Sequence, residues 1–518
     1  MNVWSHAPLT PVGFLHRAVA AHADRVAIID GQRAWTYQQM LDQTSRMAGV
    51  IKRLSGGKPV AILSPNTPGM LLALFSIPWS ATPMVPLNTR LSAGELAALV
   101  EHSGAGLLLY DSSLRDVVSA LTARLPTPLQ TCALDDADDR GINPVLLAEA
   151  PMPFIPPAET ALLSINYTSG TTGRPKGVMY QHRGAYLQAL AMVAHTQLTP
   201  AAVYLWTLPM FHCHGWCFPW AVTATGATHV CMPRIDQEAI WSALTTKGVT
   251  HLHGAPTVLS MIADAPGAVS LHRPVHVGTG GAPPSPALLR RMASLGFDIT
   301  HLYGLTETYG PALICEWRPE WDAFADSDQA KLKSRQGVGN VISQPARVIT
   351  PDGRDVPADA STVGEIALQG NNVMLGYYND PDATAATITD GWLRTGDLGV
   401  IHPDGYIELR DRSKDVIISG GENITSVQIE NVIAEHPAVA EVAVIGAPDQ
   451  KWGEVPIAYI TVRGHHTLQA EEVKELVRSR LARFKTPKEV IIVDDLPKTS
   501  TGKIQKHLLR SARALYST

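Results

Sequence analysis

Short apolar runs that end in loops rich in glycine or proline alternate with helical segments along most of this chain. The runs occupy residues 58–67, 228–233, 249–256, 274–283 and 298–307. A helix is expected over residues 92–104, because Ser92 can cap its start and Gly104 follows its end. Strands that alternate with helices predict mainly parallel α/β sheets, and ligands of such sheets gather at the loops beyond the carboxyl ends of the strands.

A chain of 518 residues exceeds a single hydrophobic core. From about Val348 the sequence turns to short strands with Asp-Gly turns, which is typical of a hairpin-rich β subdomain. The last part has its own strands and a helix, expected over residues 471–484 with Val473, Leu476, Val477 and Leu481 on one face. We therefore predict an α/β protein with two domains. A large N-terminal domain, residues 1–411, holds mainly parallel sheets flanked by helices plus the β-rich subdomain, and a small mobile α+β domain occupies residues 412–518.

Composition excludes several classes of function. The formal net charge of −5 argues against nucleic-acid binding and against a polybasic membrane-surface protein. Five cysteines in 518 residues do not form a disulfide framework, so we expect reduced thiols and a cytoplasmic protein. The N-terminus shows no secretory signal pattern. The apolar stretch over residues 70–87 is broken by three prolines, so a buried helix and strand are expected there and no integral membrane segment.

The stretch YTSGTTGRPKGV, residues 167–178, follows an apolar run and has seven Gly, Ser or Thr residues among its twelve. This composition suits a loop that grips a phosphate chain. The loop fails the Walker A pattern, because Pro175 stands where the second glycine is required, and it lacks the Gly-x-Gly-x-x-Gly pattern of dinucleotide sites. The alternative, an ordinary surface turn, is disfavoured by the unusual mixture of glycine, threonine and lysine.

Five further stretches occur in a fixed order after this loop. They are GTGGAPPS (278–285), YGLTET (303–308), LRTGDL (393–398), DRSKDVIISGGENI (411–424) and PKTSTGKIQK (497–506). Together with the loop they resemble the adenylate-forming superfamily, and most closely its acyl-CoA synthetases for medium-chain fatty acids, methylmercaptopropionate-like acids or aryl acids. The resemblance covers nearly the whole chain. It implies a two-step reaction, in which a carboxylate and ATP give an acyl-adenylate and pyrophosphate, and a thiol then displaces AMP.

The resemblance implies an ATP site that is spread over both domains. It comprises Thr168, Ser169, Gly170, Thr171, Thr172, Gly173, Arg174, Pro175, Lys176, Gly281, Ala282, Pro283, Tyr303, Gly304, Thr306, Asp397, Arg412 and Lys503. The loop offers backbone N–H groups, hydroxyls and an ammonium to the β- and γ-phosphates.

The resemblance also assigns roles within this site. Tyr303 stacks on adenine, Asp397 accepts the ribose hydroxyls and Arg412 supports the ribose or phosphate. The implied catalytic residues are Lys503, His212, Thr306 and Glu307. Thr306 contacts the α-phosphate, and Glu307, with Thr168, binds Mg²⁺, a hard cation that prefers oxygen ligands. Lys503 neutralises charge at the α-phosphate and the attacking carboxylate.

In the family the small domain rotates between the two steps, about a hinge that Lys414 matches here. Rotation replaces Lys503 with the SGGEN stretch, and the implied CoA-binding residues are Trp216, Ser419, Gly420, Gly421 and Glu422.

The segment PMFHCHGWCFPW, residues 209–220, permits two interpretations. Its His and Cys residues could form a metal site, but their spacing fits no standard zinc signature. The resemblance instead places the acyl pocket here, formed by His212, Trp216, Phe218, Gly280 and Gly304. The segment has no carboxylate to pair a substrate ammonium, which favours a plain short- or medium-chain monocarboxylic acid over an amino acid.

The expected partners are the acid, ATP and CoA, with a second copy of the chain as a further candidate. Loading of a separate carrier protein is the first alternative, and a luciferase-like oxygenase is a weaker one. A non-catalytic nucleotide-binding protein is disfavoured, because Thr306, Glu307, Asp397 and Lys503 occur together.

Overall fold

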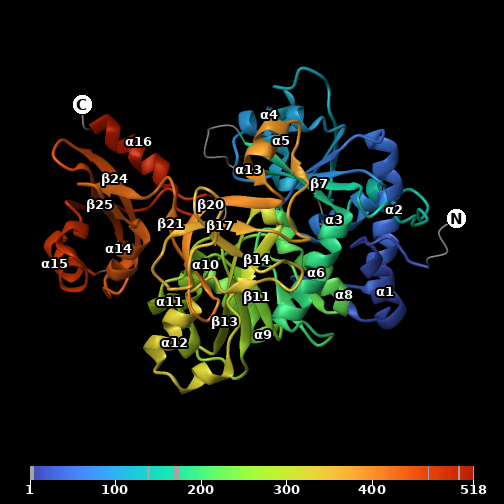
Figure 1. Cartoon of the computed structure of the whole chain (residues 1–518). Helices are drawn as coiled ribbons and strands as arrows, with labels where there is room; N and C mark the ends of the chain where they lie inside the picture. The colour runs from blue at the N-terminus through green and yellow to red at the C-terminus, as the bar shows by residue number, and fades with distance from the viewer. Residues whose placement is uncertain (1–4, 137–140, 169–174, 465, 500–501, 517–518) are drawn as a thin grey trace.

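The computed structural model describes residues 5–136, 141–168, 175–464, 466–499 and 502–516, with side chains to residue 513 (Figure 1). The elements of the N-terminal part form a large body, and the last elements of the chain, drawn orange to red, group beside it. The mainly parallel α/β architecture and the small C-terminal α+β unit are as predicted.

A nine-stranded sheet forms one half of the large body. Its order is β15 (Val338–Gly339), β14 (Gly310–Ile314), β13 (Phe297–Leu305), β12 (Val275–Thr279), β11 (His251–Gly254), β9 (Val203–Leu205), β10 (Thr228–Val230), β1 (Val26–Asp30) and β2 (Arg33–Thr36). The six strands from β13 to β1 pair in parallel, and antiparallel strands close both edges. Strand β13 carries Tyr303 and Gly304, so the predicted site begins at its carboxyl end.

A seven-stranded sheet carries the phosphate loop. Its order is β18 (Gly376–Tyr377), β8 (Lys176–Gln181), β7 (Leu162–Thr168), β4 (Met84–Pro86), β3 (Val60–Leu63), β5 (Leu107–Tyr110) and β6 (Gln130–Ala133). Strands β7 and β8 pair antiparallel with Thr168 opposite Lys176, so the two ends of the loop lie side by side.

Helices cover these sheets and fill the space between them. They are α1 (Gly13–His22), α2 (Tyr37–Ser55), α3 (Pro68–Trp79), α4 (Ala93–Ser103), α5 (Arg115–Thr122), α6 (His182–Thr196), α8 (Phe218–Thr225), α9 (Gln237–Thr246), α10 (Pro256–Ala263), α11 (Pro286–Ser294) and α12 (Asp326–Lys333). Helix α3 is buried along its whole length and leads into the buried strand β4, as the apolar stretch predicted. Helix α4 begins with a capping box between Ser92 and Glu95, and ends at the left-handed Gly104.

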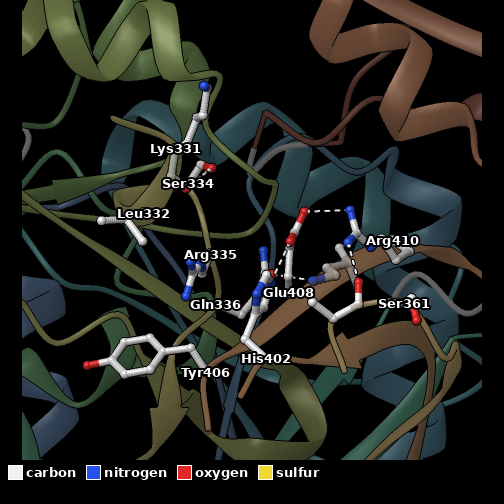
Figure 2. A network of polar contacts seen from close by, with 12 residues as sticks. Lys331, Leu332, Ser334, Arg335, Gln336, Ser361, His402, Tyr406, Glu408 and Arg410 are labelled. Atoms are coloured by element: carbon white, nitrogen blue, oxygen red, sulfur yellow. Dashed lines mark hydrogen bonds and ion pairs between the residues drawn. The ribbon is translucent and has the colours of Figure 1, made fainter. Parts of the chain in front are cut away.

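The β-rich subdomain is an antiparallel sheet of β16 (Arg347–Ile349), β17 (Gly364–Leu368), β20 (Trp392–Ile401), β19 (Ile388–Thr389) and β21 (Ile407–Arg412). Figure 2 shows Glu408 of β21 between His402 and Arg410; its carboxylate lies 2.7 Å from each partner. Arg410 also donates to the carbonyl of Ala360. These contacts stabilise the β20–β21 hairpin, which carries Asp397 and Arg412 directly opposite one another.

The C-terminal unit has its own sheet and its own apolar core. Its strands are β22 (Ile417–Ser419), β23 (Glu422–Ile424), β24 (Val439–Asp449), β25 (Gly453–Val462) and β26 (Glu489–Ile492), and its helices are α14 (Ser426–Ile433), α15 (Ala470–Arg480) and α16 (Lys506–Tyr516). Val473 and Val477 are buried as expected. The predicted helix is too long, however: α15 ends at Arg480, Leu481 is extended, and a short turn leads into Pro487. We propose the domain boundary between residues 411 and 412, at the end of β21.

A carboxylate at the end of β21 holds the first helix of the C-terminal unit. Asp411 is buried, and its Oδ2 accepts from the backbone N–H of Ser426 at 2.5 Å. Its Oδ1 accepts from the Ser426 hydroxyl at 3.1 Å. Among the described residues, Thr425 at the N-cap position of α14 makes no capping bond through its side chain. Asp411 therefore supplies the cap from outside the helix.

We predict that Asp411→Ala loosens α14. Loss of a helix cap costs about 1–2 kcal/mol, which corresponds to a roughly 5- to 30-fold loss of amide-exchange protection in that helix. Hydrogen exchange of residues 429–433 measures the effect, with Asp352→Ala in an exposed turn as the control. Unchanged protection of α14 in Asp411→Ala would contradict the capping role.

Candidate active site

The β13 end and the β20–β21 hairpin bring three predicted residues together. The Tyr303 hydroxyl donates to Asp397 Oδ2 at 2.7 Å, and Arg412 Nε lies 3.1 Å from Asp397 Oδ1. Tyr303 and Asp397 are both buried. Burial, and then the charge of Asp397, raise the pKa of Tyr303 far above its usual value, so this hydroxyl stays a donor. The carboxylate is thus fixed in orientation beside a buried ring and a guanidinium.

Lys503 enters this site from the C-terminal unit. Two hydrogen bonds join it to Thr499: Thr499 N donates to the Lys503 carbonyl at 2.7 Å, and Lys503 N donates to Thr499 Oγ1 at 3.1 Å. Gly502, with φ +82°, packs so closely on Thr257 of α10 that an added Cβ would overlap the threonine hydroxyl. The segment that carries Lys503 therefore contacts the large body directly.

The surroundings of Lys503 disfavour its charge. Burial, and then the positive charge of Arg412, lower the pKa of the Lys503 amine to about 7, although Asp397 acts in the opposite direction. Burial, and then the charge of Lys503, lower the pKa of His212 to about 4. His212 is therefore neutral at pH 7 and lies near the lysine, so these two predicted residues from different domains share one site.

The segment after His212 has an unusual backbone. Residues 213–217, which include the short element α7 (Cys213–Trp216), have φ between +47° and +66° and form a left-handed turn. Each residue other than glycine costs about 1–2 kcal/mol in this conformation. Gly215 is the one glycine of the five, and an added Cβ there would lie 2.6 Å from Trp206 Cζ3. Strain of this size persists where packing fixes the chain, and such strain is typical of functional sites.

The left-handed turn places Trp216 between two glycines. A Cβ at Gly280 would lie 3.1 Å from Trp216 Cη2, and one at Gly310 would lie 3.2 Å from Trp216 Cβ. The Trp216 ring also lies near His253, with ring centroids 6.3 Å apart. The ring centroids of Phe218 and His253 are 4.0 Å apart. The predicted pocket residues Trp216, Phe218 and Gly280 therefore meet at one aromatic cluster, which is completed by a histidine that the sequence did not single out.

Glu307 lies in the short turn Thr306–Thr308 that follows β13. Its Oε1 accepts from the Tyr377 hydroxyl at 2.7 Å, and its carbonyl accepts from Met374 N at 2.8 Å. The Tyr180 hydroxyl donates to the Thr306 carbonyl. Gly304 packs against the backbone of Gly310, where a Cβ would overlap the carbonyl oxygen. Sequence reasoning missed Tyr180 and Tyr377, because each reaches this turn from a distant part of the chain.

Several predicted residues are not joined to this group. Ser169, Gly170, Thr171, Thr172, Gly173 and Arg174 lie outside the described residues. Gly281, Ala282 and Pro283 form the loop after β12, with Gly281 exposed at φ +85°. The predicted CoA-binding residues Ser419–Glu422 form the β22–β23 turn, where Gly420 N donates to the Trp452 carbonyl within the C-terminal unit.

Two features are absent from the described part of the chain. Its His, Cys, Asp and Glu side chains include no group of three or more that could hold a metal ion. None of the helices within the same ranges is both long enough and apolar enough to cross a membrane.

Comparison with known proteins identifies the family. The model of the AMP-binding enzyme family matches residues 15–378, and the model of its C-terminal domain matches residues 428–503. The chain belongs to the AMP-binding enzyme family. The first match covers the β13 turn with Tyr303 and Glu307, and the second ends at Lys503.

Similar proteins extend over nearly the whole of this AMP-binding enzyme. It is 40% identical to a 2-methylpropanoate–CoA ligase of Humulus lupulus and 41% identical to an acetate/butyrate–CoA ligase, peroxisomal, of Arabidopsis thaliana. Each alignment covers 98% of this chain and 95% of the relative. Among solved structures, ATP-bound MatB from Rhodopseudomonas palustris has a TM-score of 0.84 at 28% identity, with 97% of this chain and 98% of that chain covered.

We predict that ATP binding takes up protons. At pH 8 the Lys503 amine, with its pKa near 7, is mostly neutral, and the phosphates of ATP raise this pKa by favouring the charged form. Uptake should approach one proton per ATP at pH 8 and fall toward zero at pH 6, where the amine is already charged. Calorimetry in two buffers of different ionisation enthalpy measures the number.

Lys503→Met should abolish most of this uptake, and Lys474→Met on α15 should leave it unchanged. Equal uptake in Lys503→Met and in the unaltered enzyme would assign the proton to another group.

Proposed function

We propose that this AMP-binding enzyme is an ATP-dependent carboxylate–CoA ligase that activates a short- or medium-chain monocarboxylic acid. The observation that carries the proposal is the packing of the segment that holds Lys503 on Thr257 of the large body, where the charges of Arg412 and Asp397 are close enough to shift the pKa of the Lys503 amine. The relatives named above are CoA ligases, and their similarity to this chain extends over nearly its whole length. This confirms the expected enzyme class.

The arrangement suits the joining of two anions. In the first step the acid carboxylate attacks the α-phosphorus of ATP, an O–P bond forms and pyrophosphate leaves. Lys503 and Arg412 supply positive charge where negative charge accumulates. Asp397 is oriented by Tyr303 and Arg412, and we assign it to the ribose hydroxyls.

The residues near the phosphate loop fit a magnesium ion. Glu307 offers a carboxylate and Thr168 a hydroxyl, and both are oxygen donors of the kind that Mg²⁺ prefers. A single protein carboxylate is usual for Mg²⁺ bound together with a nucleotide, because phosphates and water complete its six ligands. When bound, the ion would neutralise phosphate charge.

In the second step the thiol of CoA attacks the acyl carbon and AMP leaves. We assign Lys414 to the hinge and residues 419–422 to the passage of the thiol, since Gly420 and Gly421 both have positive φ and leave the backbone open to close approach. We further propose that the enzyme works in the cytoplasm, as the reduced cysteines suggest.

The aromatic cluster at Trp216 favours small acids. The indole is held between Gly280 and Gly310 and backed by His253 and Phe218, so it occupies volume that a longer acyl chain would need. The relatives named above act on acetate, butyrate and 2-methylpropanoate by their names, and this range agrees with a short pocket.

A pyrophosphate-release screen over carboxylic acids tests the proposed function. We expect release with acids such as acetate, butyrate and 2-methylpropanoate, and thioester formation when CoA is added. Lys503→Ala should slow adenylation by at least about 100-fold, because it removes charge from the transition state. It should largely spare thioester formation from a pre-made acyl-adenylate. Equal loss in both half-reactions, or release that is fastest with an amino acid, would overturn the assignment.

We predict that Trp216→Ala shifts the preferred acid toward longer chains. Each additional buried methylene contributes roughly 0.8 kcal/mol, so kcat/KM for hexanoate relative to acetate should rise about tenfold or more. Trp317→Ala, at a partly buried tryptophan that contacts Lys333, is the matched control. An unchanged chain-length profile in Trp216→Ala would remove the indole from the pocket.

A further inference from the structure

The segment 374–378, which contains β18, joins the phosphate loop to the turn that carries Glu307, two parts of the proposed nucleotide site that are far apart in sequence. Tyr378 N donates to the Gly177 carbonyl at 2.6 Å, and Leu375 N donates to the Met179 carbonyl at 2.9 Å, both in the strand that follows the phosphate loop. One residue earlier, Met374 N donates to the Glu307 carbonyl at 2.8 Å. The backbone of residues 374–378 therefore connects the exit of the phosphate loop to the turn that carries Glu307.

The Tyr377 side chain also connects these two parts of the site, because it contacts a charged group of each. Its hydroxyl lies 2.7 Å from Glu307 Oε1, and the Lys176 ammonium lies 4.6 Å from the centroid of its ring. One aromatic side chain therefore contacts the expected metal ligand at its edge and a lysine of the phosphate loop at its face. Contact of a cation with the face of an aromatic ring contributes about 0.5–1 kcal/mol or more where water is excluded.

Tyr377 is itself held firmly. It is 6% exposed, and its backbone N–H donates to Thr384 Oγ1 of α13 (Pro381–Thr387) at 2.9 Å. The preceding Gly376 has φ +143°. A Cβ added to it would lie 2.8 Å from Thr384 Cγ2, so a larger residue does not fit there. Burial, and then the Glu307 carboxylate, raise the pKa of Tyr377, so the hydroxyl remains a proton donor throughout the physiological range.

We propose that Tyr377 is a positioning residue that sets the Glu307 carboxylate for Mg²⁺ and the Lys176 ammonium for the phosphates of ATP. The hydroxyl engages Oε1 and so fixes the rotation of the carboxylate. The ring holds Lys176 at the base of the phosphate loop. This inference rests on the proposed nucleotide chemistry and extends it to a residue with no assigned role.

Hydrogen bonds to a metal ligand commonly control its affinity: removing such a partner costs roughly 10- to 100-fold in metal binding. Tyr377 differs from such a partner because it also contacts a second cation. Its hydroxyl and its ring therefore have separable effects. Loss of the hydroxyl alone weakens the binding of Mg²⁺. Loss of the ring also weakens the binding of ATP in the absence of Mg²⁺.

Equilibrium ATP binding, measured by calorimetry without any acid or thiol, separates the two effects. In Tyr377→Phe, ATP binding without Mg²⁺ should stay within twofold of the unaltered enzyme, and the Mg²⁺ concentration for half-maximal tightening should rise roughly tenfold. In Tyr377→Leu, metal-free ATP binding should also weaken several-fold, because Lys176 loses the ring. Tyr406→Phe is the matched control: this buried tyrosine, labelled in Figure 2, donates to the Glu316 carbonyl away from the phosphate loop.

A double-mutant cycle gives the decisive comparison. In a Glu307→Gln background, adding Tyr377→Phe should change the Mg²⁺ requirement less than twofold, since the carboxylate it would orient is gone. An effect as large as in the unaltered enzyme would overturn the proposal. So would an unchanged Mg²⁺ requirement in Tyr377→Phe, or equal weakening of metal-free and Mg²⁺-dependent binding.

If Tyr377→Phe does not fold, Tyr377→Leu and Glu307→Gln still test the proposal. Glu307→Gln must raise the Mg²⁺ requirement while sparing metal-free binding, and Tyr377→Leu must impair both. Because none of these measurements uses a carboxylic acid or CoA, a failure here is distinguishable from a failure of the pyrophosphate screen.

Discussion

The site depends on placing the partly buried Lys503 amine where the charges of Arg412 and Asp397 act on it. Burial, and then repulsion by Arg412, impose a free-energy cost on the charged lysine, and this cost lowers its pKa. Asp397 relieves only part of it, because its two oxygens already engage Tyr303 and Arg412. A polyanion restores the balance, so the site favours a ligand with the charge of ATP. The contact of Gly502 with Thr257 keeps the lysine there.

The segment that we propose as a wall of the acyl pocket is built on backbone strain rather than on charge. Five consecutive residues, 213–217, hold a left-handed turn, and their side chains include the indole of Trp216. Aromatic rings pack at the turn: the stacked rings of Tyr180 and Tyr309 have centroids 3.7 Å apart, and Tyr309 meets His214 edge-on with centroids 5.4 Å apart. This dense packing keeps the indole in one position between Gly280 and Gly310. A rigid wall discriminates between acids of different length better than a mobile one.

The sequence predicts the sheets well, because strands and helices follow from local patterns. Ser92 and Glu95 form the expected helix start, and the turn at the end of β13 brings Tyr303 to Asp397. The contact between Tyr377 and Glu307 spans 70 residues and has no local pattern that announces it. The left-handed turn was also unpredictable, since four of its five residues are not glycine. The end of α15 was missed because the apolar spacing continues to Leu481, beyond the last helical residue.

The cap that Asp411 gives to α14 has a consequence for the resting enzyme. Asp411 and Ser426 stand on opposite sides of Lys414, so a rotation about Lys414 would separate them. A helix that loses its cap is less stable by about 1 kcal/mol, which corresponds to a roughly fivefold population bias toward the arrangement that retains it. The unliganded enzyme would then dwell in the form that accepts ATP. Its apparent affinity for CoA would be weakened by the same factor, because CoA must draw on the less populated form. The order in which the substrates bind would thus follow in part from one buried carboxylate.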